Sequence, residues 1–178
     1  MVDSKKRGFT LIELMVVMSI MAVMSTVFIS ILRMNQQSWE VAQSHMAVSG
    51  ELRRGLDAMV RELVSSRADQ VDIPADDIWY PSIAFAVPED LDEDGSILDS
   101  NGAVEWSDEI VYSLDGQQAI REQDGEQRVL ANGVQELEFR RDSTNTSVIE
   151  IRLSVQKATD TQDFPNTGEM STRVRLRN

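Results

Sequence analysis

Residues 9–32 read FTLIELMVVMSIMAVMSTVFISIL and form the most apolar stretch of the chain. Eighteen of these 24 residues are apolar, and Glu13 is the only charged one. As a helix, the stretch would be about 36 Å long, which is enough to cross a hydrocarbon core of about 30 Å. The pattern therefore predicts a transmembrane helix that begins at Phe9.

A short basic segment precedes this helix. It holds Lys5, Lys6 and Arg7 against the single acid Asp3, whereas residues 9–178 hold 14 basic and 29 acidic residues. Cationic flanks tend to stay in the cytoplasm, so we expect a cytoplasmic N-terminus and a body outside the membrane. An ordinary secretory signal fits poorly, because its apolar core is shorter and a small-residue cleavage site follows it.

The composition narrows the range of functions. The chain has 178 residues, no cysteine, one histidine and a net charge of −13. It therefore offers no disulfide, no thiolate metal site and no multi-histidine metal site. Strong acidity opposes nucleic-acid binding, which needs cationic groups on phosphates. No nucleophile elbow, P-loop or dinucleotide-binding fingerprint occurs, so we expect that the protein is not an enzyme.

Helical character is expected to continue beyond the membrane. No proline occurs from Gln36 to Arg67, and apolar residues recur there at helical spacing. This apolar stripe consists of Leu52, Leu56, Met59, Val60 and Leu63. Gly50 and Gly55 either weaken the helix or let another backbone approach it. The stripe needs a packing partner, and the rest of the chain is the obvious candidate.

After Asp69 the pattern changes to loops and strands. Prolines punctuate a loop-rich region around a short apolar segment, residues 83–87. Strand-like runs follow at residues 109–114, 117–122, 127–131, 134–140, 148–155 and 172–176. An Asp-Gly or Asn-Gly pair follows each of the first three runs and favours a tight hairpin. Glu136, Glu138, Arg140 and Arg141 are expected on a solvent-facing side. We predict an α+β fold in which the second half of the helix packs on one antiparallel sheet.

The junction between the basic segment and the helix resembles a known processing signal. Residues 5–14, KKRGFTLIEL, closely resemble the N-terminus of type IV prepilins and type II secretion pseudopilins. The resemblance implies that a prepilin peptidase cuts between Gly8 and Phe9 and that Phe9 is then N-methylated. It also implies that Glu13 pairs with the N-terminal amine of a neighbouring subunit during assembly. The alternative is a plain signal anchor that happens to carry these residues.

Beyond residues 5–32 the resemblance is one of architecture. Major subunits of the family usually have a helix-kinking proline where this chain has Ser30, and many have a C-terminal cysteine pair, which this sequence lacks. Residues 51–63, 129–139 and 173–178 look like J-type pseudopilins and W-type minor pilins, and the sequence does not separate the two. These features favour a minor subunit that helps initiate or cap a type IV pilus or a type II secretion pseudopilus.

The resemblance also implies an organisation and a location. We expect a cytoplasmic leader (residues 1–8), a transmembrane assembly helix (residues 9–32) and an extracytoplasmic pilin-like head (residues 33–178). The chain would cross the inner membrane once, and after assembly its head would lie in a periplasmic pseudopilus or at a pilus tip. Expected partners are other pilin or pseudopilin subunits and the prepilin peptidase and methyltransferase, but not nucleic acid.

A second candidate site lies at residues 90–101, which read DLDEDGSILDSN. Alternating carboxylates with a glycine turn supply the oxygen ligands that calcium prefers. The candidate ligands are Asp90, Asp92, Asp94, Ser96 and Asp99. Asn101 stands where an EF-hand has a bidentate glutamate, so Asp99, Glu105 or Asp108 would have to replace it. The alternative is a solvated acidic loop.

Calcium binding would also be compatible with a different function. The second hypothesis is a membrane-anchored, exported calcium-binding module that never joins a filament. The filament hypothesis requires no cofactor. The sequence leaves open which machine the protein serves, its position in a filament and the identity of its neighbours or of any secreted cargo.

Overall fold

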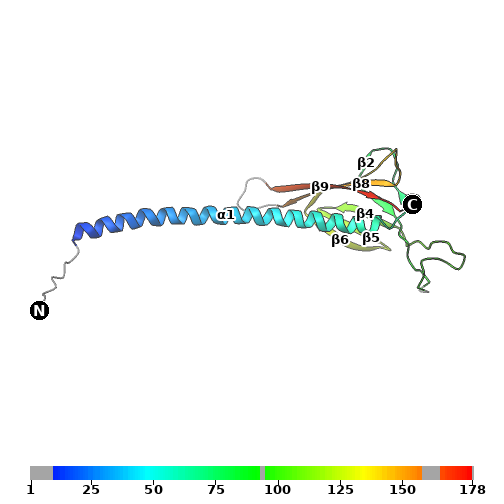
Figure 1. The fold of residues 1–178 in the computed structure, drawn as a ribbon, viewed down its shortest axis with the longest axis horizontal. Coiled ribbons are helices and arrows are strands. Elements are labelled where there is room, and N and C mark those ends of the chain that lie inside the picture. The colour runs from blue at the N-terminus through cyan, green and yellow to red at the C-terminus, as the bar shows by residue number, and fades with distance from the viewer. Residues whose placement is uncertain (1–9, 93–94, 158–164, 178) are drawn as a thin grey trace. The chain divides into compact units, whose positions relative to one another are not determined.

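A computed structural model describes residues 10–92, 95–157 and 165–177. The chain divides into two compact units, Met1–Ala42 and Gln43–Asn178. Helix α1 (Leu11–Leu63) contributes to both units (Figure 1). The remaining elements all lie in the second unit, which combines the last turns of α1 with β-sheets. The predicted α+β class with a long N-terminal helix is therefore confirmed.

Helix α1 ends at Leu63 rather than at Arg67. The amides of Ser65 and Ser66 bond to the carbonyls of Glu62 and Leu63 at 3.0 and 3.1 Å, which tightens the chain into shorter-range turns. The buried Ser66 then turns its carbonyl to the amide of Arg177 at 2.9 Å, so the C-terminal segment is fixed beside the helix end. A short 3-10 helix, η1 (Ala68–Gln70), follows.

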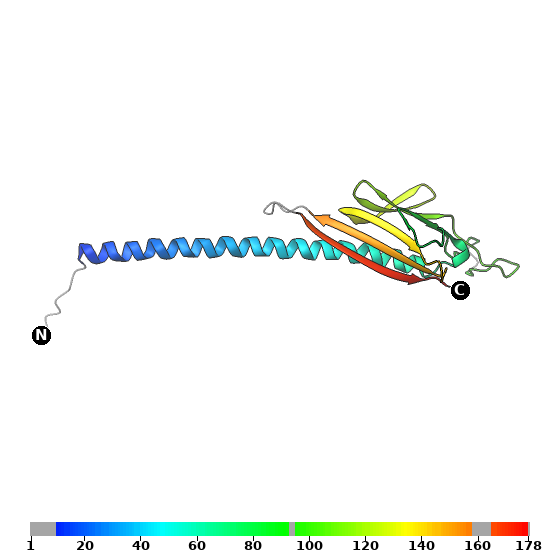
Figure 2. The same cartoon turned by 90° about the horizontal axis from the view of Figure 1, so that it is seen from above.

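The described strands form two antiparallel sheets rather than the single sheet expected. The five-stranded sheet has, in spatial order, β1 (Val71–Asp72), β3 (Ile83–Phe85), β4 (Ile110–Asp115), β5 (Gln118–Gln123) and β6 (Glu126–Asn132). The four-stranded sheet has the order β2 (Trp79–Tyr80), β7 (Val134–Arg141), β8 (Val148–Lys157) and β9 (Asn166–Arg175), and Figure 2 shows its three long strands side by side. Each predicted strand is present, whereas β1, β2 and β3 were not predicted. Strand β3 lies in the short apolar segment at residues 83–87.

The Asn132-Gly133 pair explains why the sheets are separate. It does not close a hairpin, because β6 pairs with β5 and β7 pairs with β8. Gly133 has φ +69°, and a Cβ there would lie 2.7 Å from the carbonyl oxygen of Gln156. The Gln156 amide donates to the Gly133 carbonyl at 2.7 Å, so this corner carries the chain from one sheet to the other. By contrast, Asp124-Gly125 does close the β5–β6 hairpin, with φ values of 54° and 77°.

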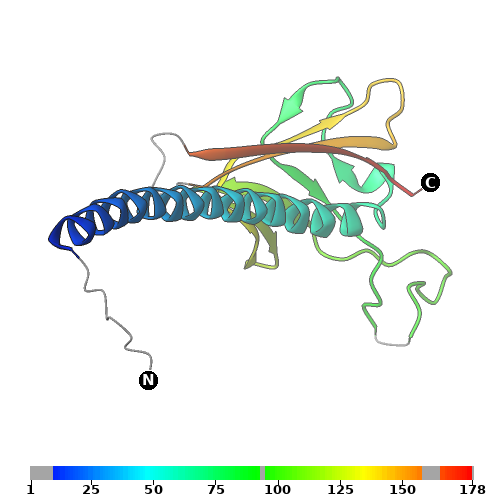
Figure 3. The ribbon, with the colours of Figure 1, turned by 60° about the vertical axis from the view of Figure 1, so that its left-hand side comes forward.

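The apolar stripe on α1 forms the helical side of the core. Four of its members are buried, namely Leu52, Leu56, Met59 and Leu63, and Val60 is partly buried beside them. Val48, one turn earlier on α1, is buried as well. Gly55 lets the sheets approach, since a Cβ there would lie 3.0 Å from the Cβ of Ala131 and 3.1 Å from Leu153. Gly168 on β9 likewise lets this strand approach α1, because a Cβ there would lie 2.6 Å from Val48 and 3.0 Å from Leu52. Figure 3 shows β9 alongside this stretch of α1. The predicted packing of the stripe on a sheet is therefore confirmed.

Strands β7 and β8 supply the opposite wall of the core. Seven apolar residues of these two strands are at most 2 % exposed; they are Val134, Leu137, Phe139, Ile149, Ile151, Leu153 and Val155. Val134 and Leu137 are three residues apart, which would place them on opposite faces of a regular strand. An irregularity in the register between Val134 and Glu136 brings both residues to the same face.

A polar contact joins the end of α1 to the five-stranded sheet. The buried Tyr112 hydroxyl donates to Glu62 Oε2 at 2.7 Å, and Arg121 Nε donates to the same oxygen at 2.8 Å. Burial, and then the Glu62 carboxylate, raise the pKa of Tyr112 above its usual range. The centre of the Tyr112 ring lies 5.0 Å from the ring centre of Phe85 and 6.4 Å from that of Phe139. Tyr112 therefore lies where the helix and both sheets meet.

Arg141, predicted on a solvent-facing side of β7, bonds to backbone instead. Its guanidinium donates to the carbonyls of Ala68 and Thr146 at 2.6 and 2.7 Å, and to those of Val71 and Ile73 at 3.3 Å. Partial burial lowers the pKa of this guanidinium, although the group stays charged at any physiological pH. Arg141 thus ties the irregular segment after α1 to the end of the four-stranded sheet.

Candidate functional site

The first candidate site is the N-terminal processing motif. The predicted cleavage residues Gly8 and Phe9 lie outside the described residues. Thr10 is the N-cap of α1, and Glu13 stands at the third helical position. The Glu13 carboxylate accepts the Thr10 amide at 3.0 Å and its hydroxyl at 2.9 Å, while the Glu13 amide donates to the same hydroxyl at 3.3 Å. This reciprocal arrangement is a capping box.

The capping box was not predicted, although its sequence signature is present. Thr10 and Glu13 have the spacing of a Ser/Thr-x-x-Glu motif ahead of an apolar run. Both of the Thr10 bonds go to Glu13 Oε2, and Oε1 accepts none from the residues that the structure describes. The first turn of α1 therefore orients the Glu13 carboxylate through Oε2. Its other oxygen, Oε1, can accept a hydrogen bond from a group outside the described residues.

The segment after the capping box suits a lipid environment. Every residue from Thr10 to Glu40 is exposed within this chain. Among the described residues, α1 is the one helix long and apolar enough to cross a membrane. Its hydroxyl side chains donate to carbonyls three or four residues earlier at 2.8–2.9 Å; they are Ser19, Ser25, Thr26 and Ser30. Internal bonding of this kind removes much of the cost of placing hydroxyls in hydrocarbon.

Ser30 occupies the position at which the resemblance to type IV pilins leads us to expect a proline in major subunits. Its amide remains within α1, and its hydroxyl bonds to the Thr26 carbonyl at 2.9 Å. A proline would remove that amide as a donor and clash with the preceding turn. With serine at this position, α1 continues without a break.

The second candidate site is the acidic loop between β3 and β4, which projects from the sheets in Figures 1 and 3. One ligand oxygen from each of Asp90, Asp92 and Glu105 lies within 4.8 Å of the others. The amides of Leu91 and Gly95 donate to Glu105 and Asp90, both at 2.8 Å, so two of the carboxylates are held by backbone. Three converging carboxylates can hold a divalent cation such as calcium.

The remaining predicted ligands are placed differently. Asp94 lies outside the described residues. Asp99 accepts the amides of Asn101 and Ala103 at 2.8 and 2.9 Å, and the Ala103 bond is the main reason that the pKa of Asp99 is lowered. Ser96 accepts the Leu98 amide through its hydroxyl. Asp99 does not belong to the converging carboxylates, whereas Glu105, one of the three proposed replacements for the EF-hand glutamate, does.

Comparison with known proteins supports the first site. Residues 3–29 match the prokaryotic N-terminal methylation motif. No curated protein and no solved structure gives a significant match to the chain. The match covers the basic segment, the expected cleavage junction, Glu13 and most of the apolar segment. The chain therefore carries a prepilin-like leader, and this motif implies a processed, membrane-anchored subunit of the type IV pilin or pseudopilin kind.

Proposed function

We propose that the protein is a minor pilin or pseudopilin, of the J or W type, that helps initiate or cap a type IV pilus or a type II secretion pseudopilus. The observation that carries this proposal is the match of residues 3–29 to the methylation motif. A prepilin peptidase would cut between Gly8 and Phe9 and methylate the new N-terminus. The head would then lie outside the inner membrane, in the periplasm or at a pilus tip.

The exposed apolar half of α1 supports assembly with other subunits. Its large side chains are left mostly uncovered by the described residues, as Leu11, Met15, Met18 and Phe28 show with at least 62 % exposure each. Lipid covers such a surface in the bilayer. Outside the bilayer, the helices of neighbouring subunits would have to cover it, because an apolar surface of this size is not left in water.

Glu13 would set the axial position of each helix relative to its neighbour. A carboxylate in an apolar segment is costly unless a partner neutralises it. Oε1 of Glu13 bonds to no described group, and it would accept the cationic N-terminal amine of a neighbour. One such ion pair for each subunit would fix the axial register between adjacent helices. Assignment to a minor rather than a major subunit is supported by Ser30, which replaces the usual proline.

Site-specific photo-crosslinking in cells tests this function. A photoreactive amino acid replaces Val27, which is 51 % exposed on the apolar half of α1. We expect crosslinks to pilin-like or pseudopilin-like subunits. The matched control replaces Asp115, an exposed residue at the end of β4, and should give no crosslink to another subunit's apolar helix. Absence of subunit crosslinks at Val27 would favour the anchored module that never joins a filament.

We also propose that the acidic loop binds calcium. This proposal is supported by the convergence of Asp90, Asp92 and Glu105. A ligand that binds only the folded state stabilises it by about 2.7 kcal/mol at one hundred times its dissociation constant. We therefore expect millimolar calcium to raise the melting temperature of the full-length protein. The double variant D90N/D92N should lose the increase, and the exposed control D115N should keep it. No increase in the parent protein would refute calcium binding without affecting the filament role.

A further inference from the structure

A cleft of about 420 Å³ opens beside β1, at one edge of the five-stranded sheet. One side is formed by residues 69–72, and the other by the end of β3 together with Trp106, Ser107 and Glu109. Backbone bonds fix both sides: the Ala86 amide donates to the Gln70 carbonyl at 3.1 Å, and the Ser107 amide donates to the Val87 carbonyl at 2.8 Å. The cleft is therefore built into the sheet.

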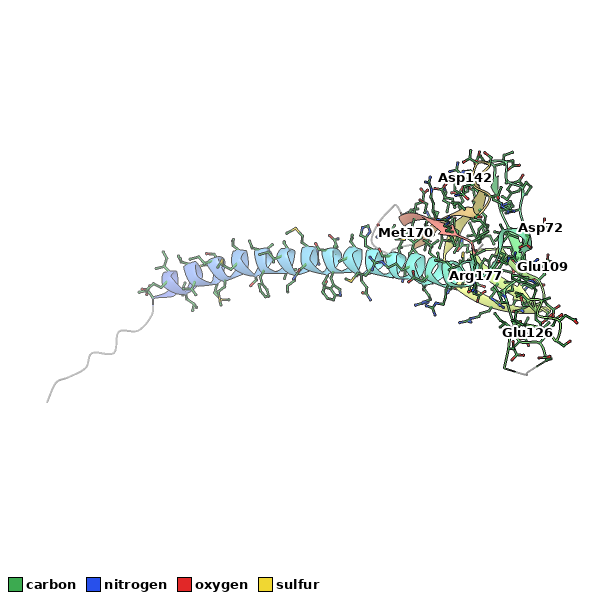
Figure 4. All side chains as sticks on the ribbon, turned by 45° about the vertical axis from the view of Figure 1, so that its right-hand side comes forward. Asp72, Glu109, Glu126, Asp142, Met170 and Arg177 are labelled. Atoms are coloured by element: carbon green, nitrogen blue, oxygen red, sulfur yellow. The ribbon has the colours of Figure 1, made fainter. Side chains whose placement is uncertain are left out.

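The lining of the cleft is acidic. Asp69, Asp72 and Glu109 contribute carboxylates, and no lysine, arginine or histidine is among the lining residues. In Figure 4, Asp72 and Glu109 are labelled at the same end of the head. Within the described part of the chain, neither the Asp72 nor the Glu109 carboxylate forms an ion pair with a lysine or arginine. Two carboxylates in one cleft thus lack a described cation.

The chain itself places a guanidinium at one end of this lining. The Arg67 guanidinium carbon lies 6.0 Å from the centre of the Trp106 ring, and Arg67 Nε lies 3.6 Å from Asp69. A cation within about 6 Å of an aromatic ring is attracted by the negative face of that ring. Trp106 and Asp69 therefore already lie beside an arginine of the same chain, and this arginine is not among the residues that line the cleft.

We propose that this cleft binds an arginine or lysine side chain on an extended basic segment of a partner protein. Asp72 and Glu109 would take the cation, and the Trp106 ring would contact its apolar stem. An elongated organic cation fits better than a metal ion. Among the described residues, the group of carboxylates that converges within 4.8 Å is that of Asp90, Asp92 and Glu105, not that of the cleft.

The surface next to the cleft favours the same kind of partner. Asp108 lies between two lining residues, Ser107 and Glu109, in the sequence. It raises the pKa of Asp124 by a side-chain hydrogen bond, and the charges of Asp108, Glu89 and Glu126 act in the same direction. Negative charge is therefore dense around the cleft, so a basic segment would be attracted before it enters.

Binding to a defined peptide tests the proposal on the full-length protein in detergent micelles. The probe is a fluorescein-labelled peptide of alternating serine and arginine, and its control has citrulline, a neutral analogue, at each arginine. Fluorescence anisotropy should show binding of the arginine peptide only. We expect D72N/E109Q to weaken binding at least about tenfold, and Trp106→Leu to weaken it several-fold.

The matched control variant removes two negative charges, as D72N/E109Q does, but from positions outside the cleft. D57N/E136Q neutralises two exposed acids outside the cleft and should change the dissociation constant by less than about twofold. Trp39→Phe, at an exposed position on α1, is the control for Trp106→Leu. The single variants Asp72→Asn and Glu109→Gln are measured as well, so that a folding defect in one does not remove the test. Equal binding of both peptides, or equal weakening by D72N/E109Q and D57N/E136Q, would overturn the proposal.

Discussion

Thr10 and Glu13 bond to each other in both directions across the first turn of α1, through a Thr10 hydroxyl that both donates to and accepts from Glu13. Glu13 therefore has a role within its own chain in addition to the proposed role between subunits. A helix cap needs a hydrogen-bond acceptor at this position, which glutamine also supplies, whereas pairing with a cationic amine needs the negative charge. Two substitutions can separate these roles.

We predict that Glu13→Gln strongly reduces assembly and that Thr10→Val preserves it. The glutamine keeps the capping box but loses a charge-assisted contact worth about 1.5–3 kcal/mol, so incorporation into filaments should fall about tenfold or more. The valine loses part of the cap but leaves the carboxylate. The measurement is the fraction of the subunit that co-sediments with filaments. Normal incorporation of Glu13→Gln together with failure of Thr10→Val would show that Glu13 serves mainly as a cap.

We predict that Gly168→Ala destabilises the head. A Cβ at this position would lie 2.6 Å from Val48 and 3.0 Å from Leu52, so β9 and α1 would have to move apart. Overpacking of this kind costs about 1–3 kcal/mol. Gly50→Ala is the matched control, because its Cβ meets nothing within 4 Å and alanine is the better helix former by about 1 kcal/mol. Thermal melting should show a lower midpoint for Gly168→Ala and an unchanged or higher one for Gly50→Ala.

Tyr112 predicts how stability depends on alkaline pH. Its pKa is raised in the folded state, so below about pH 10 the phenol is protonated in both states and favours neither. Above about pH 10 the unfolded chain releases the proton and the folded chain retains it, so stability falls by up to about 1.4 kcal/mol per pH unit. Denaturant unfolding between about pH 9 and 12 should show this loss.

Tyr112→Phe should be less stable than the parent at neutral pH by about 1 kcal/mol, because the bond to Glu62 is lost. It should also have a shallower decline above about pH 10. The comparison is Tyr80→Phe, which removes the other tyrosine of the chain. The bond to Asp76 also raises the pKa of Tyr80, but this residue is partly exposed, so its removal should have a smaller effect than removal of the buried Tyr112. An equal change in slope for both variants would contradict the assignment of the alkaline loss to the buried phenol.

Local patterns predicted the parts of the fold that depend on local physics. Alternation of apolar residues predicted β8, because one of its faces is buried along its whole length. The helical stripe predicted the buried face of α1 for the same reason. Strands β1 and β2 have two residues each, which is too short for any periodicity, and they exist because partners far along the chain pair with them.

The features that the sequence did not predict depend mostly on contacts between residues far apart in the chain. Asn132-Gly133 has the sequence of a hairpin turn, but its conformation is fixed by Gln156 on another strand. Arg141 looks like a solvent-facing strand residue, yet its four carbonyl partners come from separate segments. In the acidic loop, Glu105 rather than Asp99 joins the converging carboxylates, because Asp99 caps its own turn.

The most direct test of the account is the N-terminus of the mature protein, read by mass spectrometry of protein isolated from membranes of cells with an active prepilin peptidase. We predict a chain that begins at Phe9 and carries one methyl group on its amine, and a strain without the peptidase should retain the leader. A chain that keeps residues 1–8 in the presence of the active peptidase, or that is cut after the apolar segment, would contradict the account.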